Sequence, residues 1–499
     1  MLICSEPAHI RAADLRLDNT LASILATDQV PEEAMDYATD LLHSTTEKLT
    51  PAQLVDNISL KVFNNILKVS SPYHEDHTQE YLAILVHYIQ DADFQQKIAT
   101  PLTLQRLLDL LLTFSTHLSP QETRTVFHEL ATQTDPNKVA SEETNVVLMV
   151  RLASSLAAVS ASDAFVQNVS LQSHLFEKIV EMLREPVKGP ATVCACVMLG
   201  NLATSDRVCI DMVDATVGMA LHNPLIDILS NSKETALLYA AEGFMRHLAF
   251  PEPNRSILGE SGLISTCCHL LTLEDPSVRG EAAAILCKLV SNCLPNIEKV
   301  LNEAIPAGIT PVQLPDTDTE VPTNPTILYH IVSQALAPSA PLPSTTMKNP
   351  MIELGRTIIT ILRYLRTTPP NPSSSPTTLT DKFFQTPLIA RPIARLVRQR
   401  FYADARSEGL LGLGLMAQSR EGAVCVVQEM EHDGGLLEAI KEFAVEQKGE
   451  GQASDDKAGR DWQNAVVLLH GVAENGVSLC DGGNNEWSSC ANYVCRRVR

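Results

Sequence analysis

The chain has 499 residues, with 38 Lys and Arg against 59 Asp and Glu, which gives a formal net charge of −21. This acidic balance disfavours a nucleic-acid binder and adhesion to an anionic lipid leaflet, because both need a basic surface, and it favours solubility or a basic partner. The 45% hydrophobic content excludes a disordered chain, and the 5% aromatic share argues against stacking platforms for bases or sugars. The length fits about three domains or one repetitive array.

The N-terminal segment 1–45 is predicted to be an atypical cap. It has no basic stretch followed by an apolar run, so we expect no secretory signal, and no apolar run in the chain is long enough to span a membrane. The run His74-Glu-Asp-His77 follows Ser-Ser-Pro among polar residues, so we expect a solvated loop there and no metal site. Most of the 12 cysteines lie in apolar stretches, as free buried thiols do, which predicts a reducing, cytoplasmic setting.

Residues 46–304 are predicted to form a first array of helical repeats. The stretch that begins at Ser155 aligns with the one that begins at Met198, 43 residues later, and Arg246-His-Leu-Ala249 and Cys287-Lys-Leu-Val290 keep the same phase. A period of about 40–47 residues with two or three helices per unit is typical of armadillo and HEAT repeats. The sequence therefore predicts an all-α fold, an armadillo/HEAT-type right-handed superhelical solenoid with Pro-rich loop insertions.

Prolines mark the interruptions of this pattern. Residues 305–350 are predicted to be a Pro-rich insertion or linker. A second array of armadillo repeats follows at 351–480, with loops at 367–387 and 446–460. Residues 481–499 are rich in Gly, Asn and Ser at their start and are expected to form a flexible tail.

Signals for chemistry are weak. The chain has no GxxxxGK[ST], no GxSxG and no HExxH, so we expect no catalytic residue, no cofactor and no metal centre. Gly409, Gly412 and Gly414 lie in a helical apolar pattern, where small residues let neighbouring helices approach. One basic stripe is expected to be a solvated helix face that pairs with acidic surroundings, with a binding patch as the alternative. It consists of Arg391, Arg395, Arg398, Arg400 and Arg406.

The third helix of each repeat supplies the candidate binding residues. In an armadillo unit this helix lines the inner groove, and the position of Asn201 points into it. Its successive occupants are Ala158, Asn201, His247, Lys288, Leu415 and Gly471. The Asn201 amide has two alternatives, to bind the backbone of a partner or to tie down the neighbouring unit. His247 is expected to face the groove, because its neighbour Arg246 would be hard to bury, and Arg246 and Lys288 are further groove candidates.

The stretch Thr192–Asp206, TVCACVMLGNLATSD, with RVCIDMVDATV after it, resembles the smgGDS family of armadillo-repeat proteins that stimulate GDP dissociation from small GTPases. The next repeat, AEGFMRHLAFP at Ala241–Pro251, is similar to that family's following repeat. The resemblance covers about residues 145–300. It implies a divergent, fungal-like member of the family.

By this resemblance, the partner is a Rho- or Rap-type small GTPase with a polybasic, prenylated tail. The chain, expected to be a monomer, would promote its GDP release, chaperone it, or both. The family's two groove asparagines map to Asn201 and to His247, where this chain departs from the pattern. The alternative is an armadillo scaffold or client chaperone without exchange activity. A nuclear-import adaptor would need Trp-x-x-x-Asn ladders, which Trp462 and Trp487 do not form. We expect no binding of nucleic acid and no direct membrane insertion.

Overall fold

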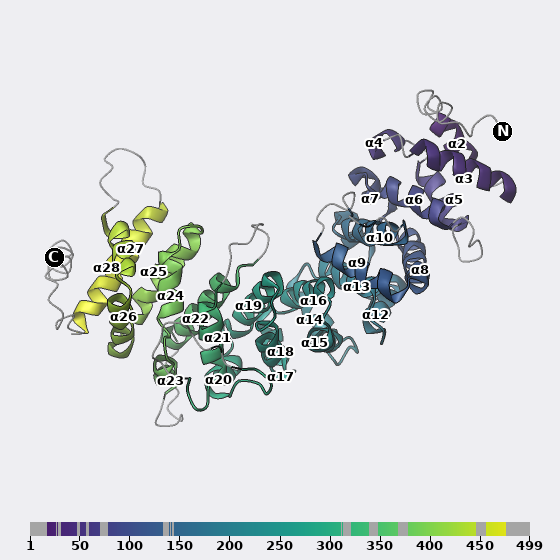
Figure 1. Cartoon of the computed structure of the whole chain (residues 1–499). Coiled ribbons are helices and arrows are strands. Elements are labelled where there is room, and N and C mark those ends of the chain that lie inside the picture. The colour runs from purple at the N-terminus through teal and green to yellow at the C-terminus, as the bar shows by residue number, and fades with distance from the viewer. Residues whose placement is uncertain are drawn as a thin grey trace. The chain divides into compact units, whose positions relative to one another are not determined.

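The computed structural model describes most of the chain and shows a helical protein (Figure 1). The described residues form 27 α-helices and no β-sheet, with one isolated antiparallel bridge between Ala304 and Thr326. They divide into two compact units, Met1–His247 and Leu248–Arg499. The described residues are 17–25, 27, 31–46, 50–55, 59–69, 78–132, 139, 141, 144–310, 312, 321–338, 348–367, 378–445 and 456–475.

The first unit contains the helices α2 to α16. They are α2 (Leu17–Leu25), α3 (Glu32–Thr46), α4 (Pro51–Leu54), α5 (Ser59–Val69), α6 (Thr78–Ile89), α7 (Ala92–Ile98), α8 (Pro101–His117), α9 (Pro120–Thr132), α10 (Thr144–Ser160), α11 (Asp163–Asn168), α12 (His174–Arg184), α13 (Pro190–Leu202), α14 (Asp206–Val213), α15 (His222–Asn231) and α16 (Thr235–Leu248).

The second unit contains the helices α17 to α28. They are α17 (Glu252–Glu260), α18 (Leu263–Leu270), α19 (Pro276–Val290), α20 (Leu294–Asn302), α21 (Ile327–Leu336), α22 (Pro350–Thr367), α23 (Leu379–Gln385), α24 (Arg391–Arg398), α25 (Ala403–Met416), α26 (Arg420–His432), α27 (Gly434–Val445) and α28 (Asp456–Glu474).

From α11 onwards the helices form triplets, in which the third helix is the longest. The triplets are α11–α13 and α14–α16 in the first unit, and α17–α19, α20–α22, α23–α25 and α26–α28 in the second. Third helices pack on one another, α10 on α13 in the first unit and α19 on α22, α22 on α25 and α25 on α28 in the second. Repeats that contact their neighbours in order make a solenoid, so the predicted repeat is confirmed. The fold is an all-α solenoid, and its right-handed superhelical course stays a prediction.

Side-chain caps begin several of these helices. Ser162, Ser173 and Ser205 each accept a hydrogen bond from a backbone N–H three residues later, at the starts of α11, α12 and α14. Such a cap satisfies one of the donors that the first helical turn leaves unpaired. Gly262 stands at the start of α18 with φ +91°, a left-handed conformation that glycine adopts without a steric penalty. Short helices can therefore follow one another through tight turns.

Two of the predicted close-packing glycines lie where helices α24 and α25 meet. A Cβ on Gly409 would stand 2.8 Å from Leu396 Cβ and 3.0 Å from the carbonyl oxygen of Ile393. A Cβ on Gly412 would stand 2.8 Å from Cγ1 of Ile359, on α22. These distances are shorter than a carbon–carbon contact allows, so the prediction that small residues bring the helices together is confirmed at both positions.

The cysteines of α13 are free and buried, as the sequence predicts. Burial raises the pKa of both Cys194 and Cys196 to about 12, so both thiols are protonated at neutral pH. They act as small apolar core residues.

The Pro-rich stretch 305–350 contains more structure than a linker. Helix α21 lies in it, packs on α20 and α22, and has Leu328 and Ile331 fully buried. Helix α23 likewise lies within the predicted loop 367–387. The predicted domain boundaries stay a prediction, and the two-unit division falls inside the predicted first array. The tail 481–499 and the run His74–His77 lie outside the described residues.

Two glycine-to-alanine changes should have opposite effects on stability. Gly409→Ala should lower the free energy of unfolding by about 1–2 kcal/mol, because the new methyl group overlaps α24. Gly243→Ala, in the middle of α16, should raise it by up to about 1 kcal/mol, because nothing lies within 4 Å of the new methyl group and alanine favours the helix. Urea unfolding monitored by circular dichroism measures both, and two changes of the same sign would contradict the packing described here.

Candidate functional site

Asn201 lies near the end of α13 and is partly exposed. Its Nδ2 donates a 2.8 Å hydrogen bond to Oγ of Ser160, the last residue of α10. Ser160 is fully buried and donates in turn to the carbonyl oxygen of Ala157. The amide therefore ties α13 to the preceding repeat through a side chain. Its carbonyl Oδ1 accepts no hydrogen bond from any described residue.

His247 occupies the same position on the next third helix, α16. Its Nδ1 lies 3.3 Å from the carbonyl oxygen of Ala203, the residue that follows α13. This pairing requires the proton on Nδ1, because a carbonyl only accepts. His247 and its neighbour Arg246 are both partly exposed. Asn201 and His247 thus lie on adjacent helices of one unit, and each reaches back to the preceding repeat.

Lys288 belongs to the second unit, on α19. Its Nζ stands 4.5 Å from the ring centroid of Phe250, whose side chain is 42% exposed. A cation over an aromatic face is an electrostatic attraction. The lysine is therefore held against a ring in the segment just before α17, within the same unit.

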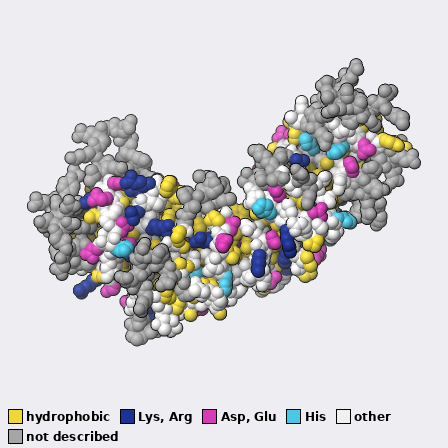
Figure 2. Space-filling view, viewed as in Figure 1, with side chains coloured by type: hydrophobic (Ala, Val, Ile, Leu, Met, Phe, Trp, Pro, Cys, Tyr) yellow, Lys and Arg dark blue, Asp and Glu magenta, His cyan; other side chains and the backbone are white. Residues whose placement is uncertain are grey.

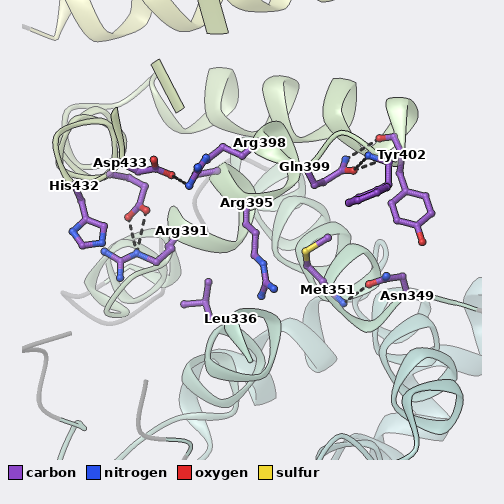
Figure 3. A pocket seen from close by; sticks show the side chains of 13 residues that line it. Leu336, Asn349, Met351, Arg391, Arg395, Arg398, Gln399, Tyr402, His432 and Asp433 are labelled. Carbon is purple, nitrogen blue, oxygen red and sulfur yellow. Dashed lines mark hydrogen bonds and ion pairs between the residues drawn. The ribbon is translucent and has the colours of Figure 1, made fainter. Parts of the chain in front are cut away.

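A cleft of about 650 Å³ in the second unit was not predicted (Figure 3). One wall of the cleft is a face of α24 that carries Arg391, Arg395 and Arg398. Residues four and three positions apart share a helix face, so the three side chains lie on the same side. Its other walls come from the ends of α21 and α26, the start of α22 and the connection from α24 to α25. Figure 2 shows Lys and Arg side chains beside hydrophobic ones on the visible face of these C-terminal helices. The remaining lining residues are Leu336, Asn349, Met351, Ala394, Gln399, Phe401, Tyr402, Glu429, His432 and Asp433.

Two of the three cleft arginines are paired with carboxylates. Nε of Arg391 lies 2.9 Å from Oε2 of Glu429, and the two side chains are only 19% and 8% exposed. Burial raises the pKa of Glu429, and the hydrogen bond and charge of Arg391 oppose this shift. Nη1 of Arg398 lies 2.5 Å from Oδ2 of Asp433. Both pairs appear as dashed lines in Figure 3.

Arg395 is paired with carbonyl groups only. Its Nη1 donates to the carbonyl oxygens of Ala335 at 2.9 Å and of Ala337 at 3.0 Å, where α21 ends. Burial lowers the pKa of Arg395, but an arginine remains charged at neutral pH. A cation is favourable at a helix C-terminus, where unpaired carbonyl groups concentrate negative potential. Among the described residues, no carboxylate balances this charge.

The rest of the predicted basic stripe is paired with acids. Arg400 and Arg406 both bind the carboxylate of Glu442. The expected pairing with acidic surroundings is therefore confirmed for four of the five arginines. The expected solvation holds for Arg400, which is 76% exposed, but not for Arg391. In the sequence, the spacing of Arg391, Arg395 and Arg398 by four and three residues was the signal that these three arginines share one face of a helix.

The first unit has a second cleft of about 870 Å³, between the α8–α9 region and the start of α13. It is lined by polar and apolar residues that include Arg124, Phe127, Val187 and Glu234. In the part of the chain that the structure describes, no group of three or more His, Cys, Asp or Glu could hold a metal ion. None of the described helices is long and apolar enough to cross a membrane.

Comparisons with known proteins give fold likenesses only. No protein-family model and no curated protein matches the chain. Among solved structures, one from a study of a phosphorylation switch between cadherin and beta-catenin has a TM-score of 0.49, 14% identity, and covers 95% of this chain and 86% of that chain. SYS-1 has a TM-score of 0.47 and 11% identity over 98% of this chain and 86% of that one. A designed armadillo repeat protein has a TM-score of 0.41 and 15% identity over 59% and 98%.

At these TM-scores the fold assignment rests on the helix packing described above. Neither sequence comparison supports the smgGDS resemblance, so membership of that family stays a proposal.

The Arg391–Glu429 pair should behave as one unit in stability measurements. Arg391→Met should lower the free energy of unfolding by about 3 kcal/mol, because it leaves a buried carboxylate without a partner. The double change Arg391→Met with Glu429→Leu should recover most of this loss, because no charge then remains buried. Urea unfolding of both single variants and the double variant tests this, and strictly additive losses would contradict it.

Proposed function

We propose that this chain is a non-enzymatic, cytoplasmic binding protein for Rho- or Rap-type small GTPases with polybasic, prenylated tails. In this proposal it promotes GDP release from the GTPase, chaperones it, or does both. The observation that carries the proposal is the placement of Asn201 and His247 on adjacent third helices of one unit, both partly exposed. These are the two positions at which the resemblance to the smgGDS family puts its GTPase-binding asparagines.

The chemistry of Asn201 fits a contact with a partner's backbone. Its Nδ2 is already used by Ser160, while Oδ1 has no partner among the described residues. A backbone N–H of a docked switch segment can donate to that oxygen. Arg246, adjacent to His247 on α16, and Lys288, on α19, are the further candidates for contact.

The charge of the chain supports a partner with a basic tail. A net charge of −21 attracts a polybasic segment over about a Debye length, roughly 8 Å at physiological salt, and raises the rate of encounter. No acidic residue is assigned to this contact.

Exchange of this kind needs no bond-making residue. A solenoid that binds the open, nucleotide-free GTPase more tightly than the GDP-bound form shifts the equilibrium between the two states. A preference of about 3 kcal/mol would change the ratio of the two states by more than a hundredfold.

A scaffold or client chaperone without exchange activity is the second candidate. It is favoured by the engagement of both key side chains with the preceding repeat, Asn201 with Ser160 and His247 with the Ala203 carbonyl. Side chains that hold repeats together are needed in any solenoid, whether or not it acts on a GTPase.

A nucleotide-release assay tests the proposal. The purified chain should accelerate release of fluorescent GDP from a polybasic Rho-type GTPase, and Asn201→Ala should reduce the acceleration about tenfold or more, because a hydrogen bond made in the open state is lost. Asn223→Ala is the matched control, because Asn223 is exposed on α15 and its side chain makes no hydrogen bond to a described residue. If the chain neither accelerates release nor forms a complex with the GTPase on gel filtration, GTPase binding is refuted. A complex without release would support the chaperone alternative.

The histidine at position 247, where the family pattern has asparagine, gives an independent test. His247→Asn restores the residue of the family pattern and should increase the rate of GDP release. The variant keeps a donor for the Ala203 carbonyl, so its stability should change little. Thermal unfolding is the control, and a slower release from a variant of unchanged stability would contradict the assignment of this position.

A further inference from the structure

The cleft on α24 has one more cation than it has carboxylates. Three arginines line it, and two of them are paired with Glu429 and Asp433, whereas Arg395 bonds only to carbonyl groups. The arginines of the cleft outnumber its carboxylates by one, in a chain whose overall charge is −21. A locally positive cleft in an acidic protein is a site for an anion.

The geometry of Arg395 leaves a binding edge open. Both carbonyl bonds use Nη1, so Nε and Nη2 have no partner among the described residues. These two nitrogens form the side edge of the guanidinium, whose parallel N–H groups match the two oxygens of a carboxylate. In Figure 3 the guanidinium lies between Leu336 and Met351, and no dashed line joins it to another drawn side chain.

The charges that line the cleft favour a ligand group with a single negative charge. A phosphate dianion on Arg395 would also face the carboxylates of Glu429 and Asp433, which already use the other two arginines. A carboxylate brings one charge to the one cation that no carboxylate balances. The cleft is therefore better matched to a carboxylate than to a phosphate.

Phe401 points to a peptide as the source of the carboxylate. Its side chain lines the cleft and is 77% exposed, which is unusual for a large apolar ring. Aromatic rings beside arginines are enriched at the energetic centres of protein interfaces. Leu336 and Met351 add apolar surface to the same cleft.

We propose that this cleft binds an acidic peptide segment of a partner protein, with a Glu or Asp carboxylate on the Nε–Nη2 edge of Arg395 and a neighbouring apolar side chain against Phe401. This site lies wholly within the second unit and is independent of the GTPase proposal, which rests on residues of α13 and α16. Its charge preference is opposite to that expected for a basic tail.

Fluorescence anisotropy with the full chain tests the ligand class. The probes are a labelled short peptide with a central Glu-Leu pair and matched peptides in which Gln, Lys or phosphoserine replaces the Glu. The Glu peptide should bind about tenfold or more tightly than the Gln peptide, because a bidentate charged contact is lost. The Lys peptide should bind no better than the Gln peptide. The assignment would be overturned if the phosphoserine peptide bound more tightly than the Glu peptide. It would also be overturned if acetate displaced the Glu peptide at the same concentration as unlabelled peptide does.

Three variants locate the site. Arg395→Gln should weaken binding of the Glu peptide about tenfold, because the Nε–Nη2 edge that holds the carboxylate is lost. Arg400→Gln is the matched control, because it removes a charge from the same stripe but lies outside the cleft lining, and it should change binding less than about twofold. Phe401→Ala should weaken binding several-fold, and the exposure of this ring makes a folding defect an inadequate explanation.

Circular dichroism melting is recorded for each variant. If Arg395→Gln melts early, Phe401→Ala decides the question alone. Equal losses for Arg395→Gln and Arg400→Gln, or unchanged binding by a folded Phe401→Ala protein, would refute the site.

Discussion

The structure depends on the burial of each third helix between its neighbours. On α13 every residue is buried except Val197 and Asn201, and the backbone at Gly200 approaches Phe244 of α16 closely enough that a Cβ would lie 3.5 Å away. A fully buried Leu contributes about 2 kcal/mol, so a row of such helices supplies much of the stability of a repeat array. A polar group on a buried helix must then find a hydrogen-bond partner within the protein. Asn201 and His247 do so through Ser160 and the Ala203 carbonyl.

This constraint links stability to recognition. Asn201 and His247 remain partly exposed on third helices, and each also joins its repeat to the preceding one. A partner that contacts Asn201 Oδ1 would bind an amide whose other end is already fixed by Ser160, so little rotamer entropy would be lost. A partner that needed the Asn201 Nδ2 would first have to break that bond. Recognition through the carbonyl end is therefore the less costly route.

The repeat pattern could be predicted because the apolar spacing of each third helix is a local property of the sequence. Helix α21 was not predicted, since the prolines on both sides of it read as a linker, and only its packing on α20 and α22 shows that it belongs to a repeat. The cleft could not be predicted, because its walls come from segments far apart in the chain. Arg391 meets Glu429 across 38 residues and Arg398 meets Asp433 across 35, and no spacing rule for one helix contains these pairs.

The proposed GTPase-binding surface and the cleft at Arg395 prefer partners of opposite charge. The net charge of −21 repels an acidic segment at long range, so the cleft at Arg395 can act only within about a Debye length, through directed hydrogen bonds. A basic segment is attracted from further away but meets no single dedicated carboxylate. Added salt therefore affects the two partners differently. It weakens the attraction between the acidic chain and a basic partner at every distance. For an acidic segment, it weakens the contact with Arg395 but also reduces the long-range repulsion by the net charge. In the two proposals, one acidic solenoid holds partners of both charges, because the basic partner depends on the charge of the whole chain and the acidic one on a single arginine that carbonyl groups hold in place.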